Sequence, residues 1–273
     1  MRRLMNIAPK RGGGVLLALL PFVLIAFLYV AGSAQRRAEN PEDKLLPPVS
    51  EMVDAVKHAA LEPDRRSGGY VLWTDTAASL RRLGLGLGIA TAIGLVFGLA
   101  IGVLPLVSAT LAPLVGVLSM IPPMALLPIL FIVFGLGELS KVVLILIGVT
   151  PFLIRDLALS ISALPPEQLV KAQTLGGSSW QVAIRVVLPQ VLPRLIEAVR
   201  LSIGPAFLFL ISAEAIASDV GLGYRIFLLR RYLAMDTILP YVAWITLLAF
   251  IMDWALARLA RKAFAFAYVT ERR

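Results

Sequence analysis

The feature that most limits how this chain can fold is a stretch of 55 residues, from position 83 to position 137, that contains no Asp, Glu, Lys or Arg. A membrane-spanning helix needs about 20 mostly apolar residues, so this stretch is long enough for two spans. The composition agrees, because 59% of the 273 residues are hydrophobic and the mean hydropathy is +0.85. An ordinary soluble domain is therefore excluded.

The residue content also excludes several kinds of chemistry. The chain has no Cys and one His, so it can form neither a disulfide, a thiolate site nor a His-based metal site. It contains no Gly-x-x-x-x-Gly-Lys-Ser/Thr loop, so a function that consumes ATP requires a partner that hydrolyses it. The net charge of +9 comes from Lys and Arg at the ends of apolar runs, which argues against a nucleic-acid partner.

Apolar runs predict six transmembrane helices, and therefore an all-α membrane protein. The first run, Val15 to Ala31, follows a basic segment and is longer than the apolar region of most signal peptides. We expect a retained anchor, although the small residues after it also fit cleavage. The other spans are expected near residues 83–104, 113–134, 142–159, 191–217 and 239–259, and the last contains Tyr241, Trp244 and Trp254, which suit an interfacial belt.

These spans divide the chain into five segments. We expect a tail over 1–14, a first membrane helix over 15–32, a polar insert over 33–78, a core of membrane helices over 79–262 and a second tail over 263–273. Within the insert, apolar residues at helical spacing from Val49 predict an amphipathic surface helix with Ser50 as N-cap and a solvated His58. The insert either docks a partner or only connects two spans.

Small residues form one face of the second span. Gly86, Ala90, Gly94, Gly98 and Gly102 recur at four-residue intervals, which stacks them on one side of a helix and lets another backbone approach closely. The pattern fits an interface within a helix bundle, an interface between two copies, or generic membrane packing.

Prolines interrupt the third span. Pro105 and Pro113 are expected to bracket a short turn, and Pro122, Pro123 and Pro128 follow within the same apolar stretch. Each proline removes a backbone donor, and lipid tolerates the freed carbonyls only where protein or water satisfies them. A broken helix that lines a pathway and a kinked packing helix both fit this pattern.

Residues 164–189 predict two short helices outside the membrane. The first begins at Pro165-Pro166 and ends at Gly176-Gly177, because glycines suit a C-terminal cap. The second begins at Ser178, where Gln181 completes a capping box, and is expected to stop at Pro189.

Two carboxylates lie within apolar spans, where a charge is costly and often functional. Glu214 is expected along a translocation path or at a gate, or else paired with an arginine of the following loop. Asp253 is a weaker candidate, because Arg258 or Arg261 near the end of its helix could pair with it.

The spacing within residues 164–189 resembles a loop of a known family. Val170-Lys171-Ala172 is followed after three residues by Gly176, after nine more by Val186 and, one residue later, by Leu188-Pro189. This is similar to the EAA loop of bacterial ABC-importer permeases, which reads Glu-Ala-Ala, three residues, Gly, nine residues, Ile, one residue, Leu-Pro. Val and Lys replace the first two positions, which affects polar contacts but not the helix-turn-helix shape.

Further segments resemble the branch of this family that imports nitrate, sulfonates, taurine and bicarbonate. They are Ser79–Arg82, Ile121–Pro128, Phe134–Lys141, Ala213-Glu214 and Gly221–Gly223, and the resemblance covers roughly residues 45–265. Arg155-Asp156 departs from the branch, which more often has Asn-Thr there, and this departure leaves room for a different solute.

The resemblance implies a type I ABC-importer permease with the MetI-like fold, working as a homodimer with two copies of an ATPase subunit and a periplasmic substrate-binding protein. It places the chain in the bacterial inner membrane with both termini in the cytoplasm. It gives the chain no catalytic residues, no metal and no cofactor of its own, since the partner uses the ATP. The implied cargo is a small oxyanion such as nitrate, a sulfonate or taurine.

The resemblance also implies two sets of functional residues. The loop would form a coupling helix that docks on the ATPase, with Trp180, Leu175 and Val182 as apolar anchors. The coupling set is Val170, Lys171, Ala172, Leu175, Gly176, Trp180, Leu188 and Pro189. The translocation path would include Pro122, Pro123, Pro128 and Glu214.

Two other classes of protein compete with this interpretation. A proton-coupled secondary transporter would use Glu214 and Asp253 as a relay and need no ATPase. A membrane-embedded enzyme would need a nucleophile and base, a metal site or a cofactor motif, and the sequence offers none. Dependence of transport on ATP separates the importer from the proton-driven carrier.

Overall fold

The computed structural model describes residues 11–41, 43–64 and 68–268, and within these ranges it consists of helices and connecting loops without a strand. The predicted all-α fold is confirmed. The α-helices are α1 (Arg11–Glu39), α2 (Val49–Leu61), α3 (Val71–Val103), α4 (Pro105–Leu118), α5 (Leu127–Phe134), α6 (Glu138–Ser162), α7 (Pro166–Thr174), α8 (Ser179–Val182), α9 (Leu188–Ile216), α10 (Leu222–Arg230) and α11 (Met235–Ala263). Shorter segments are the 3₁₀ helices η2 (Pro123–Leu126) and η4 (Ala265–Tyr268) and the π-helical η3 (Ala183–Val187).

Five continuous helices in the described part of the chain are long and apolar enough to cross a membrane, and a sixth span is broken. The broken span joins Pro105–Leu118 to Pro123–Phe134 at an angle of 79°. The prolines therefore break this span instead of merely kinking it. The turn expected between Pro105 and Pro113 is wrong, because Pro105 occupies the first position of α4, where its missing N–H is not needed.

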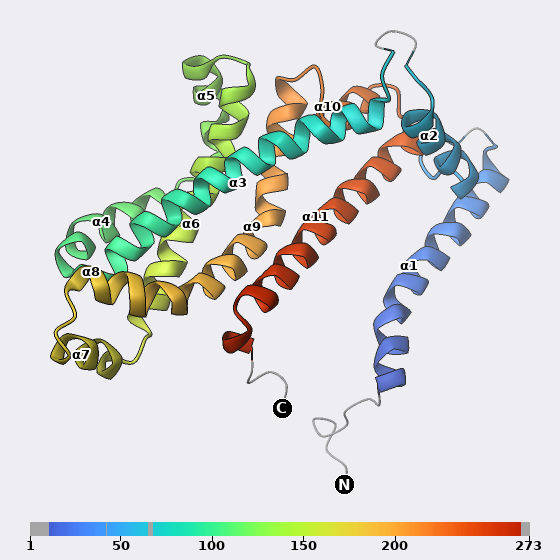
Figure 1. Cartoon of the computed structure of the whole chain (residues 1–273). Helices are drawn as coiled ribbons and strands as arrows, with labels where there is room; N and C mark the ends of the chain where they lie inside the picture. Colours follow the sequence, from blue (N-terminus) through green and yellow to red (C-terminus); the bar gives the residue numbers. More distant parts are fainter. Residues whose placement is uncertain (1–10, 42, 65–67, 269–273) are drawn as a thin grey trace.

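The core of the molecule is the packing of α3 on α6, which run side by side in Figure 1. A Cβ built on Gly94 would lie 2.8 Å from Cβ of Leu153, and one on Gly98 would lie 2.9 Å from Cβ of Leu157. Only glycine allows this approach. The face of small residues on α3 is therefore an interface within the chain.

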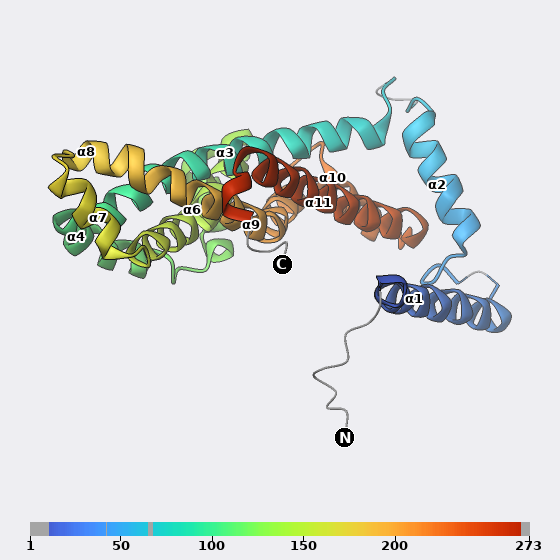
Figure 2. The ribbon, with the colours of Figure 1, turned by 60° about the horizontal axis from the view of Figure 1, so that its bottom comes forward.

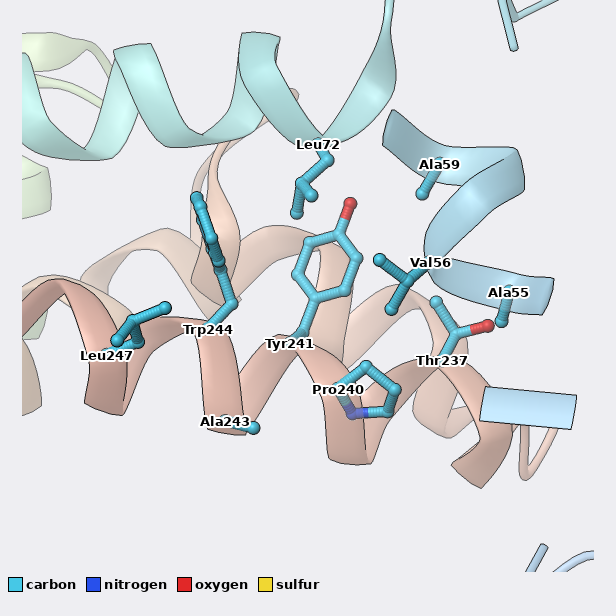
Figure 3. A pocket seen from close by; sticks show the side chains of 10 residues that line it. All are labelled: Ala55, Val56, Ala59, Leu72, Thr237, Pro240, Tyr241, Ala243, Trp244 and Leu247. Carbon is cyan, nitrogen blue, oxygen red and sulfur yellow. The ribbon is translucent and has the colours of Figure 1, made fainter. Parts of the chain in front are cut away.

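The amphipathic helix of the insert, α2, lies across the N-terminal part of α11. It begins at Val49, directly after Pro48, and no side chain caps it. Ser50 as N-cap is therefore wrong, because the extended Pro48 already ends the preceding segment and Ser50 lies within the first turn. Figure 3 shows Val56 and Ala59 of α2 facing Tyr241 of α11 across an apolar cavity of about 250 Å³.

Helix α1 stands apart from the other helices in Figures 1 and 2. Its apolar window has no buried residue. Hydrogen bonds join its end to the segment before α2, among them those from Tyr29 Oη to the Pro47 carbonyl at 2.6 Å and from Ser33 Oγ to the Leu46 carbonyl at 2.8 Å, and Arg37 Nη2 donates to Glu51 of α2 at 3.0 Å. The helix extends beyond the predicted 15–32. Most of the predicted tail over 1–14 lies outside the described residues, whereas residues 263–268 of the second tail are described and include η4.

The second short helix does not stop at Pro189, as the sequence suggested. Instead α8, η3 and α9 form one continuous helical path from Ser179 to Ile216. Pro189 lies in the first turn of α9, where a missing N–H is tolerated, and the π-helical turn before it provides the changed hydrogen-bond register. The segment after Ser178 is thus rigidly continuous with a membrane span.

Candidate functional site

A helical hairpin made of α7 and α8 projects from one end of the bundle, far from α2 and α10 in both views (Figures 1 and 2). At the turn, Gly176 has φ +84, and the Gly177 N–H donates to the Ala172 carbonyl at 3.0 Å. The capping box predicted for α8 is present, because Gln181 N–H donates to Ser178 Oγ and Ser178 N–H donates to Gln181 Oε1. The predicted end of the first short helix at the glycines and the predicted start of the second at Ser178 are therefore confirmed.

The hairpin presents apolar side chains to its surroundings. Leu175 is 88% exposed and Trp180 73% exposed, while Val170 and Lys171 are also exposed. Trp180 and Leu188 border an apolar groove of about 540 Å³ beside the end of α3. Leu188 and Pro189 are themselves half-buried, so the predicted coupling residues divide between an exposed tip and a packed base.

The other side of the hairpin is packed against the bundle. Val182 is 4% exposed and belongs to a hydrophobic cluster with Leu157 and Ile161 of α6 and Val191 of α9. Val182 as a docking anchor is therefore wrong, because its side chain faces inward. Ala172 also packs on this cluster. The base of the hairpin is thus in close contact with both α6 and α9.

The break between α4 and α5 borders a cavity of about 400 Å³ that is lined mostly by apolar side chains. Pro122 is exposed at the break, Pro123 lines the cavity, and Pro128 lies in the first turn of α5. Arg155 and Asp156, the pair found where related permeases more often have Asn-Thr, lie on the α6 side of the same cavity. The structure thus brings the predicted Pro122-Pro123 segment close to residues that the sequence did not connect with it.

Glu214 of α9 is completely buried and held by three neighbours. Arg82 Nη1 of α3 donates to its carboxylate at 2.6 Å, the Gly223 N–H donates at 2.9 Å, and Ser79 Oγ lies 2.8 and 2.9 Å from its two oxygens. An arginine of the following loop as its partner is wrong. The Glu214 side chain has no exposed surface in the described chain. It therefore does not line an open path directly in this structure.

Arg82 extends the cluster to α6 and to the loop after α9. Its Nε and Nη2 donate to the Glu138 carboxylate at 2.6 and 2.7 Å, and its Nη1 donates to the Val220 carbonyl at 2.8 Å. Lys141 Nζ lies 3.2 Å from Glu138. Four cationic and anionic side chains therefore join three elements at this end of the bundle.

A second buried carboxylate, Asp75, holds the same loop from the other side. It accepts hydrogen bonds from the Gly221 N–H at 2.9 Å and from Arg225 Nε at 2.8 Å, and Tyr241 Oη lies 3.3 Å away. Burial tends to lower the pKa of the Arg225 guanidinium, but the hydrogen bond and charge of Asp75 outweigh it, so this pKa lies above its ordinary value. Arg225 therefore remains charged.

The loop that this cluster holds requires glycine. Gly221 has φ +138, and a Cβ there would lie 2.6 Å from Cδ of Glu214. Glycine is the residue that adopts this backbone and leaves room for the carboxylate. The Gly221–Gly223 segment and the Ser79–Arg82 segment, singled out separately in the sequence, are thus parts of one cluster.

Sequence reasoning missed some members of this cluster and misplaced others. Asp75 was counted with the polar insert, but it lies in the first turns of the long α3. Tyr241 is 3% exposed and bonded to Asp75, so its place in an interfacial belt is wrong. Trp244, half-buried, donates from Nε1 to Thr76 Oγ1 at 2.9 Å, whereas Trp254 is exposed.

Asp253 pairs with a residue of another helix. Arg200 of α9 donates to both its carboxylate oxygens, at 2.9 and 3.0 Å. The expected pairing with Arg258 or Arg261 is wrong, and Arg258 instead lies over the Trp254 ring, 5.1 Å from its centroid. Within residues 11–41, 43–64 and 68–268, no three His, Cys, Asp or Glu side chains come together as a metal site.

Comparison with known proteins agrees with this architecture. Residues 87–264 match the family described as binding-protein-dependent transport system inner membrane component. The chain is 34% identical to the taurine transport system permease protein TauC of Escherichia coli (strain K12), over 70% of each chain. It is 32% identical to the bicarbonate transport system permease protein CmpB of Synechococcus elongatus, over 70% of this chain and 69% of CmpB.

Two more proteins extend the comparison. The nitrate import permease protein NrtB of Synechococcus elongatus is 26% identical over 76% of this chain and 75% of NrtB. A chain of the MetNI methionine ABC transporter, solved in inward-facing conformations, is 20% identical and superposes with a TM-score of 0.63, covering 71% of this chain and 96% of the other. The MetI-like fold expected from the resemblance is confirmed.

Proposed function

The chain belongs to the family of binding-protein-dependent transport system inner membrane components, in the branch of nitrate, taurine and bicarbonate permeases, and on this basis we propose that it forms the translocation path of an ATP-driven importer. The solute is a small oxyanion. The hairpin of α7 and α8 carries this proposal, since it combines an exposed apolar tip with a base packed on two membrane spans. The chain itself performs no hydrolysis.

The hairpin acts as a lever between an ATPase subunit and the membrane spans. Leu175 and Trp180 dock into a groove on the ATPase, because large exposed apolar side chains gain most from being covered. The cap at Ser178 and the turn at Gly176 keep the lever rigid. When the two ATPases close on ATP, the movement passes through Val182 to α6 and α9.

Two copies of the chain surround the pathway, with an ATPase under each copy and a substrate-binding protein on the opposite side. The broken span supplies part of the pathway wall through Pro122 and Pro123. The buried Glu214 and Arg82 keep the loop after α9 in place at the outer end, and so act on the gate through this loop instead of contacting the solute.

The number of spans sets the orientation relative to the hairpin. Four spans, counting the broken one, precede α7, and two follow α8, so the start of α1 and the end of α11 lie on the same side as the hairpin. Since the ATPase is cytoplasmic, both ends are cytoplasmic and the insert with α2 is periplasmic. The membrane is the bacterial inner membrane.

A proton-coupled carrier is the competing function. Its two candidate relay groups are Glu214 and Asp253, and the structure pairs each of them with an arginine, Arg82 and Arg200. Neither carboxylate is arranged as a free proton acceptor. This observation favours the ATP-driven importer.

The source of energy tests the proposal. The permease is purified with its partners, reconstituted in liposomes, and assayed for uptake of nitrate, bicarbonate and taurine with the binding protein present. We expect uptake of at least one of these solutes with ATP inside, and none with an imposed proton gradient alone. Uptake driven by the proton gradient without ATP would overturn the proposal.

A further inference from the structure

The cavity at the helix break has walls from three spans. Leu118, Ser119, Ile121 and Pro123 come from the break, Phe209 comes from α9, and α6 provides a face from Ile147 to Leu159. Its volume of about 400 Å³ lies within the range of about 300–1,000 Å³ that is usual for small-molecule sites. Apart from Ser119, Arg155 and Asp156, the side chains that line it are apolar.

The cavity contains one positive charge that no carboxylate balances. Arg155 Nη1 donates to Ser119 Oγ at 2.8 Å, and within the described residues no carboxylate oxygen lies within 4.0 Å of its guanidinium. The neighbouring Asp156 is already occupied, because Arg194 Nη2 and Nε donate to its two oxygens at 2.9 and 3.1 Å. Arg155 is therefore the uncompensated cation of this cavity.

The position of Arg155 along its helix places it inside the membrane region. It lies 17 residues after the start of α6 and seven before its end, or about 25 Å and about 10 Å at 1.5 Å per residue. An arginine at such a depth is costly unless it faces protein or water, and such residues commonly mark the path of an ion or substrate. Gly148 and the ring of Phe209, in contact with each other, form the wall nearer the outer side.

The chemistry of the guanidinium selects the kind of ligand. Its planar set of five N–H donors matches the oxygens of an oxyanion, and Ser119 uses only one of them. Arg155 is exposed in the described chain, so an anion can reach its remaining N–H groups from the open side of the cavity. A neutral or cationic solute would gain nothing comparable.

We propose that Arg155 and Ser119 form an oxyanion-binding site within the permease, at the break between α4 and α5, which the solute occupies on its way through the membrane. This inference rests on the proposed function, and it adds a selectivity site in the permease itself. The binding protein would then not be the only component that selects the anion.

The absence of cysteine provides a direct test that needs no knowledge of the solute. Ser119→Cys places a single thiol beside Arg155 in the complete transporter. Its rate of modification is measured with an anionic and a cationic methanethiosulfonate reagent, in the presence and absence of Arg155→Gln. Both reagents attack the same thiolate, so the ratio of their rates cancels any effect of Arg155 on thiol ionisation.

We expect the anionic reagent to be favoured by about tenfold relative to its ratio at a control thiol, as for one nearby unit charge in a partly aqueous site. Arg155→Gln should abolish this preference. Ser162→Cys, exposed at the end of α6, is the control, and its ratio should not change with Arg155→Gln. Millimolar nitrate, bicarbonate or taurine should slow modification at position 119, and glycerol should not.

Three results would overturn the site. They are a thiol at position 119 that neither reagent modifies, an anionic preference that survives Arg155→Gln, and modification that none of the three anions slows. None of these depends on ATP, so a transporter that still couples uptake to ATP would keep the proposed function while the site is rejected. Conversely, loss of ATP coupling with an intact anionic preference would reject only the proposed function.

Discussion

Removing Arg82 should destabilise the protein strongly, because it leaves the buried Glu214 without its cation. The Arg82 side chain is 6% exposed and that of Glu214 is 0% exposed. Breaking a buried pair by removing one partner typically costs about 3–5 kcal/mol, since an uncompensated charge remains in a low-dielectric site. We expect the free energy of unfolding to fall by an amount in this range in Arg82→Met, which retains much of the apolar stem.

Arg200→Met provides a matched control, because it breaks a similar pair of an arginine with a carboxylate between two helices. Here the side chains are 29% and 42% exposed, for Arg200 and Asp253. Because neither side chain is buried, removing the arginine leaves no fully buried charge, and the loss of unfolding free energy should be smaller than for Arg82→Met. The difference between the losses of unfolding free energy in the two variants therefore measures the effect of burying the ion pair.

A third variant tests whether the uncompensated charge of Glu214 causes the destabilisation by Arg82→Met. Glu214→Gln keeps an oxygen that can accept from the Gly223 N–H and Ser79 Oγ, but removes the charge. Added to Arg82→Met, it should restore about 2 kcal/mol, a coupling typical of residues in direct contact. The free energy of unfolding is measured in mixed micelles by titration with dodecyl sulfate, followed by circular dichroism.

The reasoning would be refuted by either of two results. One is a loss for Arg82→Met no greater than that for Arg200→Met. The other is a double variant, Arg82→Met with Glu214→Gln, no more stable than Arg82→Met alone. Either would show that the uncompensated charge of Glu214 is not what the arginine offsets.

Two further predictions concern the helix contacts. Gly94→Val should destabilise the bundle by about 1–3 kcal/mol, because its side chain would overlap Leu153, whereas Gly88→Val meets open space and should cost far less in the same titration. Ser178→Ala should remove the acceptor for the Gln181 N–H and cost about 1 kcal/mol of local stability. Hydrogen exchange measured by mass spectrometry should then show faster exchange confined to the hairpin, and unchanged exchange there would contradict the role of the cap.

Local features of the fold could be predicted from the sequence because their causes are local. The length of an apolar run limits where a span lies, and Ser178 with Gln181 forms its capping box within three residues. The small residues of α3 indicated a close helix contact. They could not identify the partner, because α6 lies far away in the sequence and any helix surface with suitable ridges would fit.

The charge cluster could not be predicted for the same reason. Arg82 and Glu214 are separated by 132 positions, and Asp75 and Arg225 by 150. A single sequence shows that such charges are costly in a membrane, but not which of them meet. The guesses for Glu214 and Asp253 therefore chose nearby arginines, while the structure pairs them across helices.

Two prolines that were expected to interrupt helices do not do so. Pro105 was expected in a turn, yet it opens α4, where the absent N–H costs nothing. Pro189 was expected to end a helix, yet the helical path continues through it, because the π-helical turn before it accommodates the missing N–H. At Pro122-Pro123 the same chemistry breaks the span. Whether a proline breaks a helix depends on its position within that helix. Where the helix begins depends in turn on tertiary contacts, which a single sequence does not show.

The central claim is that the hairpin of α7 and α8 couples this permease to a separate ATPase. Gly176 and Gly135 offer a matched pair of sites, with φ values of +84 and +74 and no atom within 4 Å of a built Cβ. Gly135→Trp adds the same side chain at a second glycine with positive φ, whose backbone (φ +74, ψ 179) is strongly unfavourable for a side chain, but only Gly176→Trp alters the docking turn.

The decisive measurement is the ATP hydrolysis that co-purifies with the tagged permease in mild detergent. We expect it in the wild type and in Gly135→Trp, and its loss together with the ATPase subunit in Gly176→Trp. Equal hydrolysis in both variants, or none in an intact wild-type preparation, would contradict the coupling role of the hairpin.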